Sequence, residues 1–206
     1  MYTSTTGAVD ETFTAIIALC ILLFVAILFF LVFFIIRYRR SRNPNPSQLH
    51  GNWILETVWI TVATVLALAI FWYGLTSFQF LKKIPSDSLP VHVTASQWSW
   101  LFTYENGRKS TDLVVPIGKD IALTMESTDV IHGFFIPAYR VKQDIVPGMK
   151  NRLWFRADQP GNVDVFCTQY CGQEHSKMLA TVYVVAPDVF TKWLAGEDVD
   201  IPGLTS

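Results

Sequence analysis

Two long apolar runs that carry no charge constrain the fold of this chain more than any other feature. The first extends from Thr12 to Ile36 and the second from Thr57 to Leu81. Each is long enough to cross about 30 Å of hydrocarbon as a helix. They hold much of the 51% hydrophobic content, which is high for a soluble protein. We therefore predict transmembrane helices at about residues 12–36 and 54–81, in an N-terminal region that covers residues 1–83.

The charges that flank the runs predict how the chain crosses the membrane. Four arginines lie between the runs, within residues 37–42, whereas the tail before Thr12 has two acidic residues and no Lys or Arg. Lys82 and Lys83 follow the second run and favour the opposite orientation, but they are fewer. Because cytoplasmic loops are rich in Lys and Arg, we expect the connecting loop inside and both termini outside. We expect the bacterial inner membrane, with both termini periplasmic, and the mitochondrial inner membrane is the alternative.

Residues 84–206 are expected to form one outward-facing domain built from strands. Short segments rich in β-branched and aromatic residues are separated by turn signals at Glu105–Gly107 and Gln159–Gly161. This pattern predicts an all-β sandwich with Greek-key connections, followed by a short helix over residues 188–194. The expected strands cover residues 91–96, 98–104, 121–126, 132–136, 152–157, 163–166 and 181–185.

The segment from Cys167 to Met178 contains two thiols, an imidazole and a thioether within a dozen residues. Thiolate and thioether are soft ligands and imidazole binds copper well, so this set is typical of copper electron-transfer sites. A mononuclear blue-copper site uses a single cysteine. The second cysteine is explained if Cys167 and Cys171 bridge two copper ions.

Each of two bridged coppers would also need one imidazole and one weak axial ligand. His175 supplies one imidazole, and His132, in an apolar run upstream, is the best candidate for the other. Met178 is then one axial ligand. A backbone carbonyl in the cysteine loop, that of Gln169, is the candidate for the other axial position.

Other interpretations of these residues remain open. In an outward-facing compartment, Cys167 and Cys171 could form a disulfide, and the same spacing occurs in thiol redox pairs. His132 could be a hydrogen-bonded core histidine. A membrane-anchored copper chaperone or thiol oxidoreductase also uses a C-x-x-x-C motif with a distant histidine, but two spans and a β-only outer domain disfavour that class.

The cysteine loop and several other segments together resemble cytochrome c oxidase subunit II, with its binuclear CuA centre. The matching segments are Gln97–Tyr104, Asp129–His132, Lys142–Gly148 and Leu55–Trp59, so the resemblance covers nearly the whole chain. It implies a cupredoxin-like outer domain that takes electrons from cytochrome c or an equivalent small carrier. It also implies an oxidoreductase and translocase whose haem-copper subunit I reduces oxygen to water, coupled to proton pumping.

The resemblance implies roles for two residues outside the cysteine loop. Trp98, the first Trp of the Gln-Trp-Ser-Trp run, would be the point at which electrons enter. Alternation along the expected strand places Trp98 and Trp100 on one face, and core packing is the alternative role. Glu56, at the inner end of the second span, would open a proton-uptake path into subunit I. An interfacial carboxylate without that function is the alternative.

Many members of the family carry Glu at the position of Gln169, where its carboxylate helps to bind magnesium at the interface with subunit I. An amide oxygen is a weaker ligand for a hard cation than a carboxylate, so we expect this magnesium site to be weakened or absent. All five side-chain copper ligands are kept, unlike in the quinol-oxidising members of the family. Neither span contains a histidine, so we expect the haems and CuB in partner subunits. Membrane lipid is a further expected partner, and nucleic acid is not.

Overall fold

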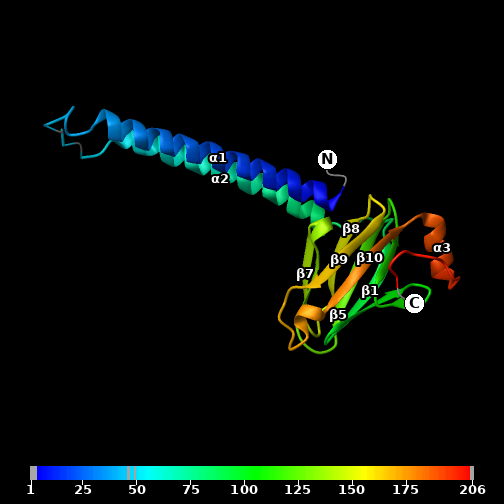
Figure 1. Cartoon of the computed structure of the whole chain (residues 1–206). Coiled ribbons are helices and arrows are strands. Elements are labelled where there is room, and N and C mark those ends of the chain that lie inside the picture. The colour runs from blue at the N-terminus through cyan, green and yellow to red at the C-terminus, as the bar shows by residue number, and fades with distance from the viewer. Residues whose placement is uncertain (1–3, 46, 49, 205–206) are drawn as a thin grey trace. The chain divides into compact units, whose positions relative to one another are not determined.

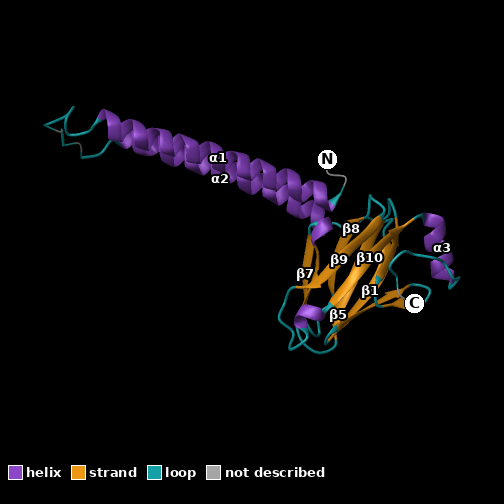
Figure 2. Cartoon of the chain, viewed as in Figure 1, coloured by secondary structure: helices purple, strands orange, loops and turns teal. Residues whose placement is uncertain are grey.

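The computed structural model describes residues 4–45, 47–48 and 50–204. It divides into two compact units (Figures 1 and 2). One unit comprises Asp10–Phe78, and the other combines the N-terminal residues up to Val9 with Gln79–Ser206.

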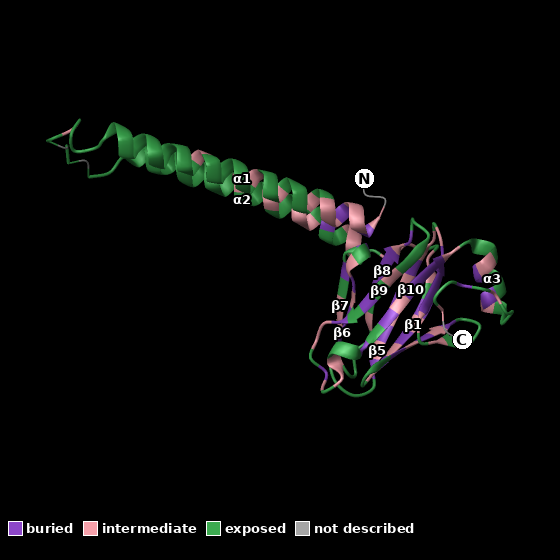
Figure 3. Ribbon diagram, in the orientation of Figure 1, coloured by how far each residue is buried: buried purple, intermediate pink, exposed green. Residues whose placement is uncertain are grey.

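Two long helices make up the Asp10–Phe78 unit. Helix α1 covers Thr5–Arg37 and α2 covers Trp53–Lys82, and within this unit they lie side by side (Figure 1). Both are long and apolar enough to cross a membrane, and most of their apolar residues are exposed (Figure 3). A helix satisfies its backbone hydrogen bonds internally, so apolar side chains on every face suit lipid rather than water. The predicted two-helix hairpin is confirmed, although both helices begin before the predicted spans.

The start of α2 is fixed by a polar residue just outside the apolar run. The Asn52 side chain accepts hydrogen bonds from the backbone N–H groups of Ile54 and Leu55, at 3.1 and 3.2 Å. This is the usual way in which Asn caps a helix, because it satisfies N–H groups that have no partner within the first turn.

The second unit contains a sandwich of two five-stranded sheets (Figure 2). The strand orders are β3-β2-β1-β5-β8 and β4-β10-β9-β6-β7. The β1–β5 and β4–β10 pairs are parallel, and the other pairs are antiparallel. The strands are β1 (Leu89–Ser96), β2 (Ser99–Tyr104), β3 (Lys109–Ser110), β4 (Leu113–Pro116), β5 (Asp120–Ser127), β6 (His132–Ile136), β7 (Val141–Ile145), β8 (Asn151–Arg156), β9 (Gly161–Cys167) and β10 (Leu179–Val185). Helix α3 (Pro187–Ala195) follows the last strand, and 3-10 turns cover Pro137–Tyr139 and His175–Lys177.

Alternating burial along the strands builds the core between the sheets (Figure 3). In β5, Ile121, Leu123 and Met125 are fully buried and their neighbours point outward. The predicted turn at Glu105–Gly107 is present, since the Gly107 N–H donates to the Tyr104 carbonyl at 2.9 Å. These features confirm the predicted β-sandwich.

Three strands, β3, β4 and β7, were absent from the predicted set. Strand β3 has two residues. All four residues of β4 are buried, so this strand lacks the alternation of a half-buried strand. Strand β7 lies at a sheet edge and carries Lys142, Gln143 and Asp144 in its middle, so its sequence looks like a loop.

Candidate metal centre

Two neighbouring strands and one loop bring the predicted ligands together. His132 is the first residue of β6, and Cys167 is the last residue of β9. Strands β6 and β9 pair in the register Phe134↔Cys167, which joins residues far apart in the chain. The loop after β9 then carries Cys171, and the chain returns through the His175 turn to Met178, just before β10.

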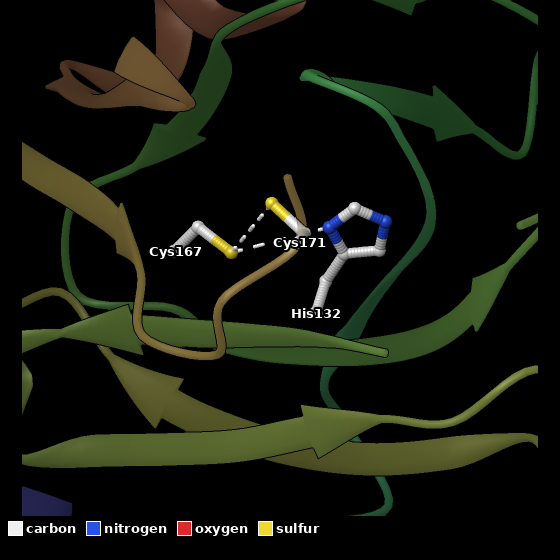
Figure 4. A group of neighbouring side chains, drawn as sticks. All are labelled: His132, Cys167 and Cys171. Atoms are coloured by element: carbon white, nitrogen blue, oxygen red, sulfur yellow. Dashed lines mark hydrogen bonds between the residues drawn. The ribbon is translucent and has the colours of Figure 1, made fainter. Parts of the chain in front are cut away.

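The two sulfurs lie at the middle of the cluster, with Sγ atoms 3.8 Å apart and both cysteines free (Figure 4). On one side, the Cys167 sulfur lies 3.9 Å from His132 Nδ1 and 3.3 Å from the Gln169 carbonyl oxygen. On the other, the Cys171 sulfur lies 3.5 Å from His175 Nδ1. It also lies 3.8 Å from the sulfur of Met178.

This arrangement fits a pair of copper ions. Each sulfur has one imidazole nitrogen and one weaker donor beside it, and the two donor sets meet at the sulfurs. Sulfur and imidazole donors select copper over hard cations such as magnesium. His132 and Met178 are fully buried, and Cys167 and Cys171 are 8% and 3% exposed, so water has little access to these groups.

Asp129 fixes the orientation of the His132 ring. Burial alone would raise the pKa of Asp129, but hydrogen bonds from His132 and from the backbone N–H groups of Gln97 and Val130 lower it from 3.8 to about 2. The ionised carboxylate can only accept, so His132 Nε2 carries the proton that is donated to Asp129 Oδ1 at 2.8 Å. His132 Nδ1 therefore keeps its lone pair on the side of Cys167.

Without metal, Cys171 is held in its thiol form. Burial, followed by the neighbouring Cys167, raises the pKa of Cys171 from 9.0 to about 11. A thiolate is the form that binds metal, so metal binding here must release protons.

The turn between β1 and β2 lies against the cysteine loop. Ser96 and Ser99 pair across this hairpin, which leaves Gln97 and Trp98 in the turn itself. The Gln97 side chain donates to the Cys171 carbonyl at 2.6 Å. The ring of Trp98 covers Gly172, where an added Cβ would lie 3.1 Å from two indole atoms.

The predicted placement of Trp98 within the second strand was wrong. Strand β2 begins at Ser99, so Trp98 and Trp100 do not share a strand face. Trp98 is 37% exposed, whereas Trp100 is 1% exposed and packs edge-on against Phe134. The alternation rule applies only within a strand, and here a tight turn interrupts the aromatic run.

The remaining predicted residue, Glu56, lies in the Asp10–Phe78 unit, exposed in the first turn of α2. In the sandwich unit, three polar residues that hydrogen-bond to residues of the site were not predicted to act there, namely Asp129, Gln97 and Asp144. Asp129 stands three residues before His132, and this spacing was the only local signal. The contacts of Gln97 and Asp144 join residues distant in the chain, which one sequence does not reveal.

Comparisons with known proteins agree with this architecture. The family model described as cytochrome c oxidase subunit II, transmembrane domain, matches residues 3–80. The model for the periplasmic domain of the same subunit matches residues 64–185.

Cytochrome c oxidase subunit 2 of Alkalihalophilus pseudofirmus is 30% identical over 198 residues, covering 90% of this chain and 58% of that protein. The protein of the same name from Cereibacter sphaeroides is 29% identical, covering 89% of this chain and 73% of its own length. This chain thus spans little more than half the length of the Alkalihalophilus pseudofirmus protein.

A solved structure is similar to the sandwich domain. The crystal structure of the periplasmic domain of subunit II of cytochrome oxidase (CoxB) of Bradyrhizobium japonicum is similar with a TM-score of 0.53 and 29% identity. The match covers 55% of this chain and 96% of the chain in the solved structure. With two membrane-length helices, a cupredoxin-like sandwich and both family models matched, the chain belongs to the cytochrome c oxidase subunit II family.

Proposed function

We propose that this chain is the electron-accepting subunit of a haem-copper terminal oxidase. Its outer domain takes single electrons from cytochrome c or a similar carrier and passes them to the haem-copper subunit I. That partner reduces oxygen to water, coupled to proton pumping. The observation that carries this proposal is the pair of matched donor sets that meet at the sulfurs of Cys167 and Cys171.

Cys167 and Cys171 would bridge two coppers, and four further donors lie beside their sulfurs. These are His132 Nδ1, the carbonyl of Gln169, His175 Nδ1 and the sulfur of Met178, which would be the terminal ligands. Bound copper would supply reversible one-electron chemistry. Because the ligands lie at strand ends and in a tightly bonded loop, the protein resists rearrangement when the charge changes.

Trp98 is the proposed point at which electrons enter this domain. Its indole is partly exposed to an approaching carrier, while the same ring lies on Gly172, which follows Cys171 directly. A π-system in this position lies between the surface and the residue that follows a cysteine ligand in the chain. The outer domain, proposed to span residues 84–206, thus has a path from its surface to the centre.

Residues 1–83 are proposed to anchor this domain in a bacterial inner membrane, with both termini outside and the arginine-rich loop inside. Glu56, at the start of α2, would then lie near the inner surface. We assign it to the mouth of a proton path into subunit I. Gln169 is proposed to leave the family's magnesium site weak or absent, because it offers an amide where relatives offer a carboxylate.

Copper stoichiometry tests this function. The full chain, purified in detergent and reduced, should bind two coppers per polypeptide. The loaded chain, once its copper is oxidised, should then accept one electron from reduced cytochrome c in rapid mixing. Binding of a single copper, or two coppers that no small carrier reduces, would contradict the proposal.

A further inference from the structure

The backbone carbonyl and the side chain of Gln169 contact different parts of the domain. Its peptide carbonyl oxygen lies 3.3 Å from the sulfur of Cys167. Its side-chain amide donates to Asp144 Oδ2 on β7 at 3.0 Å. One residue therefore connects the proposed copper centre to the edge strand of the sheet.

Strands β6 and β7 form the pair that carries His132, and β6 contacts the loop that follows Cys167. In the β6–β7 register, His132 faces Ile145 and Gly133 faces Asp144. The Thr168 N–H donates to the Gly133 carbonyl at 2.9 Å. A Cβ at Gly133 would collide with the Thr168 hydroxyl and come within 3.0 Å of the Gln169 backbone nitrogen. The loop therefore lies directly on β6, in space that only glycine leaves open.

Asp144 makes this connection selective for an amide. Its other oxygen, Oδ1, is buried and accepts no hydrogen bond from the described residues, so the Gln169 amide matters to this carboxylate. A glutamate at position 169 would place a second carboxylate against Asp144. The two negative groups would repel each other, and the contact would be lost.

We propose that Asp144 is a positioning residue for the metal centre. By holding the Gln169 side chain, Asp144 directs the Gln169 carbonyl toward the Cys167 sulfur. Gly133 provides the space in which the loop packs against β6. This role rests on the proposed binuclear copper function and adds a residue to it. It also gives the Gln169 side chain a use other than magnesium binding.

The test uses the copper-loaded full chain in detergent, with electron paramagnetic resonance and the midpoint reduction potential as readouts. Gln169→Ala keeps the carbonyl but removes the amide, and Asp144→Ala removes the acceptor. Asp144→Asn removes the charge but keeps an acceptor oxygen, so it provides the charge-only control. A weaker oxygen donor favours reduced copper, so a released carbonyl should raise the potential.

Gln169→Ala is expected to change the copper hyperfine coupling and raise the potential relative to the wild type. Asp144→Ala should show the same changes relative to Asp144→Asn, and the double alanine variant should change the hyperfine coupling no further than either single variant. Gly133→Ala, which displaces the loop without touching Asp144, should disturb the hyperfine coupling in the same way.

The positioning role is overturned if Gln169→Ala leaves both readouts of an intact two-copper centre unchanged. It is also overturned if Asp144→Ala and Asp144→Asn behave alike, because the charge alone then explains the effect. If the wild-type chain itself gives no two-copper signal, the proposed function fails, and the positioning role fails with it.

Discussion

The carboxylate of Asp129 accepts a hydrogen bond from Nε2 of His132 at 2.8 Å, while Nδ1 of the same ring lies 3.9 Å from the sulfur of Cys167. The backbone N–H of Gln97 also donates to this carboxylate, at 2.6 Å. Asp129 thus joins a proposed ligand to the turn that carries Trp98.

Replacing Asp129 with alanine should weaken copper binding. Outer partners of ligating histidines fix the tautomer and the ring orientation, and their loss typically lowers metal affinity by about 10–100-fold. Titration against a competing chelator would measure this. Asp87→Ala is the matched control, because Asp87 is an exposed carboxylate, far from the ligands in sequence, that pairs with Lys119. An affinity for Asp129→Ala within about twofold of the control would contradict this role.

The metal-free outer domain should lose the stabilisation by Asp129 in acid. The pKa of Asp129 is lowered on folding from 3.8 to about 2, so its contribution is present above pH 3.8 and disappears as the pH falls toward 2. Allowing for solvent screening, the contribution near neutral pH is about 1 kcal/mol. Urea unfolding of wild type and Asp129→Ala should differ at pH 6 and converge near about pH 2. A pH-independent difference would exclude this electrostatic origin.

Trp98→Ala should slow electron transfer from the reduced carrier without unfolding the domain. Trp100→Ala is the contrasting variant, since Trp100 is 1% exposed and its loss should cost about 3–5 kcal/mol of unfolding free energy. Stopped-flow reduction should show a large fall in rate for Trp98→Ala, with salt dependence nearly unchanged because charged groups govern docking. If Trp98→Ala instead destabilises the domain as much as Trp100→Ala does, Trp98 is a core residue.

Glu56→Gln should slow oxygen consumption by the assembled oxidase while reduction of the copper centre stays normal. A neutral amide of the same size cannot carry a proton into the membrane protein. Glu11→Gln, also in the helical unit, is the control and should leave turnover unchanged. Wild-type turnover of Glu56→Gln across the pH range would assign Glu56 to the interface alone.

The oxidase should hold its copper without tightly bound magnesium at Gln169. The amide nitrogen of Gln169 is occupied by Asp144, and an amide oxygen is a weak ligand for this hard cation. Metal analysis of the purified complex, with manganese as a paramagnetic substitute, would detect such a site. Stoichiometric manganese that Gln169→Ala releases would refute this expectation.

The parts of the fold that depend on local chemistry could be predicted from the sequence. Residues without charge over a membrane-length run have few alternatives to a lipid-facing helix, and the ligand set of Cys167–Met178 indicates copper by donor type alone. Strand β7 was missed because an edge strand tolerates polar residues on both faces. The turn at Trp98 was missed because the aromatic run conceals it, and contacts such as Gln97 with Cys171 depend on tertiary packing.

The central claim concerns two coppers bridged by two cysteines, and electron paramagnetic resonance of the oxidised, copper-loaded full chain tests it most directly. We predict one unpaired electron with hyperfine coupling to two copper nuclei. Cys167→Ser and Cys171→Ser should each abolish that pattern. Coupling to a single copper nucleus, or a metal-free chain in which Cys167 and Cys171 form a disulfide, would contradict the account.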